Sequence, residues 1–104
     1  MARMVVIYKR PEDPAAFERH YHEVHVPLAK QLPGMRKYEV SRGPVTSPSG
    51  HDDVHLVGIL HFDDMDALRR AFASEPGRAC AADRAILAPD PSLYQMYLYE
   101  DREL

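Results

Sequence analysis

The chain has 104 residues, of which 45% are hydrophobic and 28% are charged, and its formal net charge is −3. This balance is typical of a folded domain and excludes a disordered chain. It also provides no basic surface of the kind that binds nucleic acid, so we expect no nucleic-acid partner. We expect a single domain over residues 1–104.

The N-terminal apolar segment runs only from Met4 to Tyr8, which is too short for a signal-peptide core or a membrane span. The one cysteine, Cys80, lies among alanines and has no second cysteine for a disulfide within the chain. We therefore expect a cytoplasmic protein with no membrane association, and a packing role for Cys80.

The first half of the chain predicts a strand, a helix and a second strand. The segment from Met4 to Tyr8 is rich in β-branched and aromatic residues, which favours a strand. Asp13 and Pro14 then provide an N-cap and a first helical residue. The side chains of residues 35–41 alternate in a pattern that predicts a second strand. Between the two strands, apolar residues recur at helical spacing and predict one buried stripe, formed by Phe17, Tyr21, Val24 and Leu28.

The second half repeats the order strand, helix, strand after a loop. Residues 42–53 carry turn residues and predict a loop, and residues 54–62 alternate as a third strand. Asp63 is the predicted N-cap of the next helix. After the break at residues 75–77, a short helix is expected from Arg78 to Leu87 and a last strand from Leu93 to Glu100.

The order β-α-β-β-α-β predicts an α+β, ferredoxin-like fold, an antiparallel sheet with helices on one face. The third and last strands carry apolar residues on both faces, and helices can cover only one of them. The other face would leave a large apolar patch in water. We therefore expect a homodimer in which a second copy covers this face, closing a dimeric α/β barrel around a cavity.

One segment resembles a known family. The stretch from Phe17 to Ala29, followed by Leu32-Pro33-Gly34-Met35, resembles the signature of the EthD family of small dimeric α/β-barrel proteins: an aromatic residue, a histidine two residues before a proline, an apolar pair and Leu-Pro-Gly. Residues 62–68 and 73–79 also resemble the family, so the resemblance covers nearly the whole chain. It implies the dimeric barrel and a fold relationship to isomerases, decarboxylases and dehydratases, but it leaves the reaction open.

His25 is the main candidate for chemistry. Helical geometry places it roughly 80° from Phe17, at the edge of the buried stripe. Pro27 donates no backbone hydrogen bond and should kink the helix beside it. Because imidazole titrates near neutral pH, His25 is predicted to be a general acid or base. The alternative is that its ring caps the kinked helix by bonding a freed carbonyl.

His55 and His61 are predicted to share one face of the third strand and to point into the barrel, with His61 as a second catalytic group. His22 and His25 are three residues apart but lack a third ligand, so we predict no metal and interpret His22 as solvent-facing. The residues expected to contact substrate are Tyr8, Tyr21, Tyr38, His55 and Tyr97.

We therefore expect an enzyme that needs no bound cofactor and acts on a small apolar carbonyl, lactone or aromatic metabolite. His25 would move a proton in an isomerisation, dehydration or decarboxylation. One alternative is a non-catalytic accessory protein that holds such a metabolite in the same cavity. Another is a haem-binding, monooxygenase-like barrel with His25 as axial ligand, which the absence of tryptophan disfavours.

Overall fold

The computed structural model describes residues 1–50 and 53–104, so part of the predicted loop at 42–53 lies outside the described residues. Its four strands are antiparallel and lie in the order β2-β3-β1-β4, which confirms the ferredoxin-like α+β fold. In chain order the elements are β1 (Ala2–Lys9), α1 (Pro14–His20), the π-helical turn η1 (Tyr21–His25), α2 (Val26–Ala29), β2 (Lys37–Val40), β3 (Val54–Phe62), α3 (Met65–Ala73), α4 (Glu75–Leu87), the short turn η2 (Pro91–Leu93) and β4 (Tyr94–Glu100).

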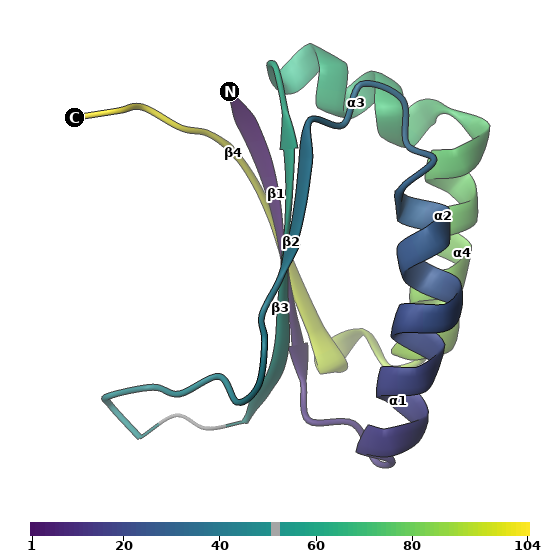
Figure 1. Ribbon diagram of the computed structural model, residues 1–104, viewed down its shortest axis with the longest axis vertical. Helices are drawn as coiled ribbons and strands as arrows, with labels where there is room; N and C mark the ends of the chain where they lie inside the picture. The colour runs from purple at the N-terminus through teal and green to yellow at the C-terminus, as the bar shows by residue number, and fades with distance from the viewer. Residues whose placement is uncertain (51–52) are drawn as a thin grey trace.

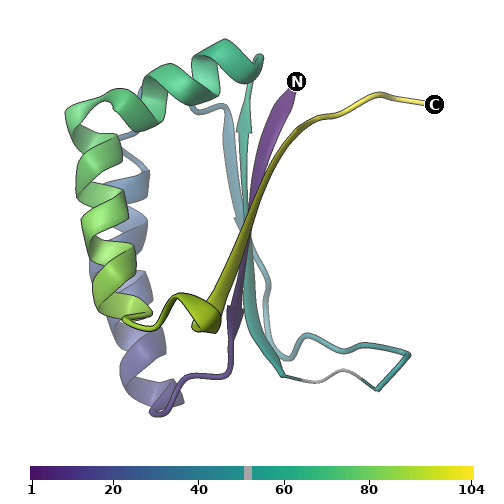
Figure 2. The same ribbon diagram turned by 180° about the vertical axis from the view of Figure 1, so that it is seen from behind.

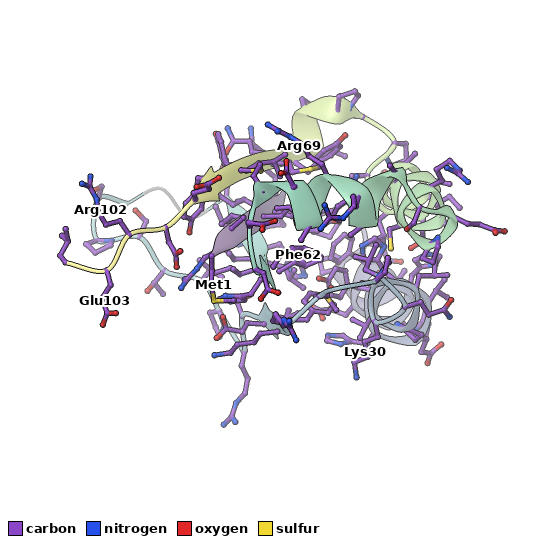
Figure 3. All side chains as sticks on the ribbon, turned by 90° about the horizontal axis from the view of Figure 1, so that it is seen from above. Met1, Lys30, Phe62, Arg69, Arg102 and Glu103 are labelled. Carbon is purple, nitrogen blue, oxygen red and sulfur yellow. The ribbon has the colours of Figure 1, made fainter. Side chains whose placement is uncertain are left out.

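All the longer helices lie on one face of the sheet. Figure 1 shows α1, η1 and α2 as one continuous rod beside α4, with α3 crossing at one end. None of the helices in the described residues covers the opposite face, and both the segment that follows β2 and the C-terminal residues extend past that side (Figures 1 and 2). Seen from above, Phe62 points toward the helices, whereas Arg102 and Glu103 lie beyond the uncovered side (Figure 3). The sheet therefore has an inner, helix-covered face and an outer, bare face.

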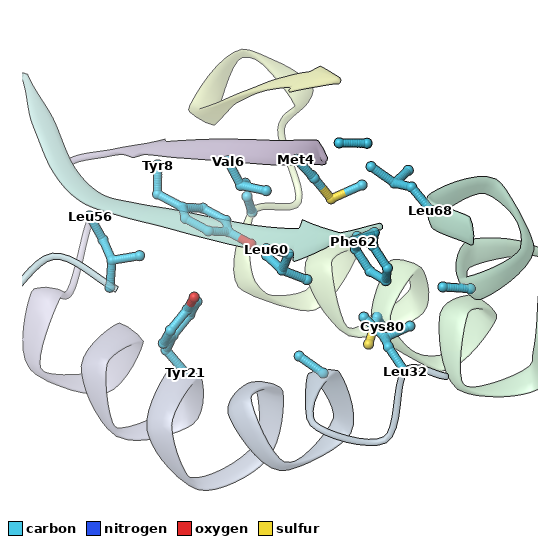
Figure 4. Packing of buried hydrophobic residues seen from close by; sticks show 14 of the residues in the cluster. Met4, Val6, Tyr8, Tyr21, Leu32, Leu56, Leu60, Phe62, Leu68 and Cys80 are labelled. Carbon is cyan, nitrogen blue, oxygen red and sulfur yellow. The ribbon is translucent and has the colours of Figure 1, made fainter. Parts of the chain in front are cut away.

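The core lies between the sheet and the helices. The side chains of the central strand β1 alternate strictly between the two faces. The even-numbered residues are buried, and the odd-numbered residues lie on the outer face. Figure 4 shows Tyr8 from β1 and Tyr21 from η1 extending into the same space between the two layers. The largest fully buried side chains are Tyr8, Tyr21, Phe62, Leu56, Leu68 and Cys80, so the expected packing role of Cys80 agrees with its burial.

The first helix differs from the prediction at one important point. The backbone N–H of Val26 donates to the carbonyl of Tyr21, five residues earlier, so one turn is π-helical rather than α-helical. This turn takes up one extra residue and rotates everything after it relative to an ideal helix. Val24, predicted to be buried, is 40% exposed, and His25, predicted at the edge, is buried. The buried stripe is in fact Phe17, Tyr21, His25, Ala29 and Leu32.

The expected kink at Pro27 takes the form of this wide turn, in a helix that continues in nearly the same direction (Figure 1). Proline has no N–H and crowds the carbonyl four residues before it, and a π turn relieves both conflicts locally. π turns inside α-helices occur often at functional sites.

Two predicted helix starts were wrong. The cap of α3 is Asp64, which accepts from the backbone N–H of Ala67, because Asp63 instead forms an ion pair with Arg36. Helix α4 begins at Glu75, not Arg78, because the Ser74 side chain accepts from the N–H of Gly77 and proline is tolerated in a first turn. A Cβ on Gly77 would lie 2.4 Å from the carbonyl oxygen of Ala71, so only glycine fits this tight corner between α3 and α4.

None of the helices within the described residues has the length and apolar character needed to cross a membrane.

Candidate active site between sheet and helices

A buried carboxylate from α4 holds two histidines of the first helical segment. Asp83 Oδ2 lies 2.9 Å from His25 Nδ1, and Asp83 Oδ1 lies 2.8 Å from His20 Nε2. The His25 and Asp83 side chains are 7% and 6% exposed, whereas that of His20 is 31% exposed. Asp83 therefore ties α4 to α1 and η1 and fixes the ring of His25 in the interior.

The π turn explains how both histidines reach one carboxylate. In an ordinary α-helix five residues turn through about 500°, which would leave His20 and His25 about 140° apart. Because η1 takes up an additional residue, the two rings lie on the same side of the helix. The backbone irregularity is thus what builds the His20–Asp83–His25 cluster.

The environment sets the protonation of His25. Burial lowers its pKa below the ordinary value of 6.5, and this effect outweighs the hydrogen bond and negative charge of Asp83, which raise it. The positive charge of Arg84 lowers it further. The ring is therefore neutral at neutral pH. Since a carboxylate only accepts, Nδ1 carries the proton and Nε2 carries the free lone pair.

Two tyrosines form a second polar pair within the same space. The hydroxyls of Tyr21 and Tyr38 lie 2.5 Å apart and share a hydrogen bond. Burial raises the pKa of both, so both remain neutral phenols. Gly58 of β3 faces this pair, and a Cβ there would lie 3.1 Å from the Tyr21 hydroxyl oxygen. Glycine therefore leaves the room that the tyrosine hydroxyls occupy.

A narrow cavity joins these groups. It has about 10 Å³ of free space, roughly enough for one water molecule. Apolar side chains such as Met4, Leu60 and Phe72 form much of its wall. Its polar lining comes from His25, three tyrosines and a buried arginine, namely Tyr8, Tyr21, Tyr38 and Arg84. The arrangement combines a neutral imidazole base, phenol donors and a cation in an apolar setting.

The structure brings together some of the predicted site residues and separates others. His25, Tyr8, Tyr21 and Tyr38 line one cavity. Tyr97 lies on the outer face, opposite Val5, and is 53% exposed. As expected, His61 lies on the face of the third strand that points away from the helices. On this outer face its Nε2 lies 2.6 Å from Oε1 of Glu39. His25 and His61 therefore lie on opposite sides of the sheet and do not meet in one cavity.

Contrary to the prediction, His55 does not share a face with His61. The register of β1 and β3 shifts between Tyr8 and Lys9, and their partners are Leu56 and Val54, so His55 is the extra residue of a β-bulge. Its ring turns to the helix side, 5.4 Å from the ring of Phe17. Its Nε2 lies 2.8 Å from Glu18 Oε1, without hydrogen-bond geometry.

A larger cleft of about 620 Å³ opens beside this bulge. His22 lies at its rim, 57% exposed and 3.2 Å from Glu18, which agrees with its expected contact with solvent. Within residues 1–50 and 53–104, no group of three or more His, Cys, Asp or Glu side chains is arranged to hold a metal ion.

Asp83 and Arg84, both of which are buried, were not predicted as site residues. A signal was present in the alanine-rich helix: Gly77, Cys80 and Asp83 recur every three residues, and Arg84 follows Cys80 by four. Two charged residues thus occupy the stripe that small buried residues define. Because fully buried charges are rare unless paired, that pattern pointed to a site.

The EthD domain model matches residues 9–89. The chain belongs to the EthD family. This EthD protein is 36% identical over 89 residues to an uncharacterised 11.0 kDa protein of the thcB–thcC intergenic region of Rhodococcus erythropolis, a match that spans 85% of this chain and 84% of the relative.

Two solved structures are also similar. An EthD family protein from Bacillus halodurans superimposes with a TM-score of 0.88 at 31% identity, covering 98% of this chain and 99% of the other. SnoaB from Streptomyces nogalater, a cofactor-independent oxygenase, has a TM-score of 0.67 at 21% identity, covering 99% and 94%. At that identity the likeness to SnoaB shows a shared fold alone.

Proposed function

We propose that this EthD protein is an enzyme that needs no bound cofactor and transfers protons on a small apolar carbonyl, lactone or hydroxyaromatic compound, with His25 as general base and acid. The observation that carries the proposal is the His25–Asp83 pair, in which a buried carboxylate fixes the proton on Nδ1 and leaves Nε2 free beside the cavity. SnoaB, a cofactor-independent oxygenase of the same fold, is a precedent for chemistry without a cofactor on this architecture.

In the proposed step, His25 Nε2 takes a proton from a carbon next to a carbonyl, or from a hydroxyl group of the substrate. The imidazolium that forms is stabilised by the carboxylate of Asp83, 2.9 Å from Nδ1. The ring then returns the proton to another atom of the intermediate, which completes an isomerisation. The neutral phenols of Tyr21 and Tyr38 would donate to the substrate oxygen on which negative charge develops.

The space between the layers must widen to admit a substrate, because the cavity as it stands holds about one water molecule. The hydrogen bond between Tyr21 and Tyr38 joins the first helical segment to the edge strand β2. Exchanging this bond for one to a substrate oxygen would open the cavity without leaving a buried hydroxyl unpaired.

We also propose a homodimer built on the outer face of the sheet. Tyr97 and Tyr99 are exposed there, and Val5 and Ile7 lie beside them on β1. Apolar side chains gathered on an uncovered sheet face are unusual on a monomer. The segment after β2 and the C-terminal residues project on the same side, where they would contact a partner subunit (Figure 2). Sedimentation at micromolar concentration should give a dimer, and a stable monomer would contradict the proposal.

The function is tested by deuterium exchange, which requires no knowledge of the natural product. Small ketones, lactones and hydroxyaromatic compounds are incubated with the protein in heavy water, and incorporation of deuterium is followed by NMR. We expect catalysed exchange of at least one class, lost in His25→Gln. If ligands stabilise the protein to heat but no compound exchanges, the alternative of a non-catalytic binding protein is favoured instead.

A further inference from the structure

Arg84 is a positively charged side chain buried in the core. The residue is 8% exposed, and its Nε atom is buried with no hydrogen-bond partner. Among the described residues it forms no ion pair with a carboxylate. Burying a guanidinium group without a counter-ion is costly, so its place in the core calls for an explanation.

The neighbouring carboxylate does not provide that explanation. Both oxygens of Asp83 are engaged by histidines, Oδ1 by His20 and Oδ2 by His25. No aspartate or glutamate belongs to the lining of the cavity that Arg84 shares with His25. The one formal charge on that lining is therefore positive.

The charge of Arg84 acts on the cavity itself. Burial raises the pKa of Tyr8 to about 12, and the positive charge of Arg84 and a hydrogen bond from its side chain both oppose that rise. The same charge also lowers the pKa of three other residues. At His25 it adds to the effect of burial, and at Tyr38 and Cys80 it opposes that effect. All four residues line the cavity, so the guanidinium group is placed among the groups that a ligand would touch.

We propose that Arg84 is the anion-binding group of this cavity, and that the ligand it takes is a small, largely apolar molecule bearing an oxyanion: a carboxylate, an enolate or a phenolate. The guanidinium fork suits two oxygen atoms or one oxygen with several lone pairs. The inference deepens the proposed function and rests on it for the reaction, because an enolate or phenolate is what His25 would generate by removing a proton. The binding of an anion stands on Arg84 alone.

Binding of benzoate and of its neutral analogue benzamide tests this inference without a known substrate. The proteins compared are wild type, Arg84→Met, which keeps an apolar chain of similar length, and Arg84→Lys, which keeps the charge but loses the fork. Affinity is measured by calorimetry or by the shift in melting temperature. We expect wild type to bind benzoate at least about tenfold more tightly than benzamide, and Arg84→Met to lose this preference. Arg84→Lys should retain part of it.

The melting temperature of the unliganded variant provides a second readout. If Arg84 serves a ligand rather than the fold, Arg84→Met should be as stable as wild type or more so, since it removes an uncompensated buried charge. A large loss of stability in both Arg84→Met and Arg84→Lys would show a structural role and would overturn the inference.

Para-nitrophenol distinguishes the two sources of the oxyanion, because its phenolate absorbs visible light and the phenol does not. A site that selects the ionised form should lower the apparent pKa of the bound probe in wild type and in His25→Gln, but not in Arg84→Met. Binding of benzoate alone identifies a carboxylate ligand, and ionised para-nitrophenol identifies an enolate or phenolate ligand.

The inference is overturned if neither probe binds at millimolar concentration, or if wild type and Arg84→Met bind benzoate equally. Failure of the proposed function has a different signature, since anion binding would then persist in a protein that exchanges no deuterium.

Discussion

Among the residues that the structure describes, two buried histidines each contact a carboxylate, and the two pairs lie on opposite faces of one sheet. His25 pairs with Asp83 on the helix-covered face, where both side chains are buried. His61 pairs with Glu39 on the bare face, where the glutamate side chain is 46% exposed. The residue types and distances are similar, but the surroundings differ.

The comparison shows that a histidine–carboxylate contact does not by itself make a reactive site. Burial of both partners fixes the geometry and strengthens the electrostatic interaction, whereas an exposed carboxylate is screened by water. The hydrogen bond to His61 lowers the pKa of Glu39, which is the behaviour of an ordinary surface pair. Only the His25 pair also borders a cavity with tyrosines and an arginine.

The largest expected difference between the two pairs is in catalysis. His25→Gln should lower the rate of catalysed proton exchange by about 10²-fold or more, because it removes the base itself. His61→Gln should leave the rate within a few-fold of wild type. The measurement is the initial rate of deuterium incorporation with each folded variant. Equal losses in the two variants would contradict the distinction drawn between the two faces.

The second difference is in stability. Asp83→Ala removes the acceptor of a buried hydrogen bond from His25 and of a part-buried one from His20, and should lower the free energy of unfolding by about 3 kcal/mol. Glu39→Ala should change the stability of a single subunit little, because that carboxylate is 46% exposed there. Urea denaturation of both variants measures the two values. Similar losses for Asp83→Ala and Glu39→Ala would show that burial does not distinguish the pairs.

The third prediction tests how side chains pack on the inner face. Gly58→Ala should cost about 1 kcal/mol or more, because the new Cβ lies 3.1 Å from the Tyr21 hydroxyl oxygen. Tyr21→Phe should cost about 1 kcal/mol by leaving Tyr38 without its hydrogen-bond partner. In the double variant the missing hydroxyl makes room for the methyl group. The loss of stability in the double variant should therefore be smaller than the sum of the two single losses. Strict additivity would mean that these groups are not in contact.

The smallest effect concerns pH. Because the pKa of His25 is lowered in the folded protein, the unfolded chain binds more protons below the ordinary value of 6.5. The contribution of the neutral ring is fully present above that value, and the free energy of unfolding should fall as the pH is lowered through and below it. His25→Gln should flatten this acid limb. His22→Gln, which removes an exposed histidine, is the matched control and should leave the slope unchanged.

Much of the fold follows from local patterns in the sequence. The third strand matches the prediction at both ends, since β-branched residues and alternation mark it clearly from Val54 to Phe62. The choice of His25 as a candidate also depended on local features, namely its place before Pro27 and its position near the buried stripe.

The rest depended on deviations from ideal geometry and on distant residues. The π turn moved Val24 out of the core and His25 into it, and the bulge at His55 turned that ring to the other side of the sheet. Ideal helical and strand periods cannot anticipate either change. Asp83 lies 58 residues from His25 in sequence, and only the packing of α4 against η1 brings the two together.

The most direct test of the central claim is the protonation state of His25, read from the nitrogen and carbon NMR signals of its ring in labelled protein at neutral pH. We predict a neutral ring with the proton on Nδ1 and a lone pair on Nε2, and the opposite tautomer or loss of a fixed tautomer in Asp83→Asn. A protonated ring, or a proton on Nε2 in the wild-type protein, would contradict the account of His25 as a base held by Asp83.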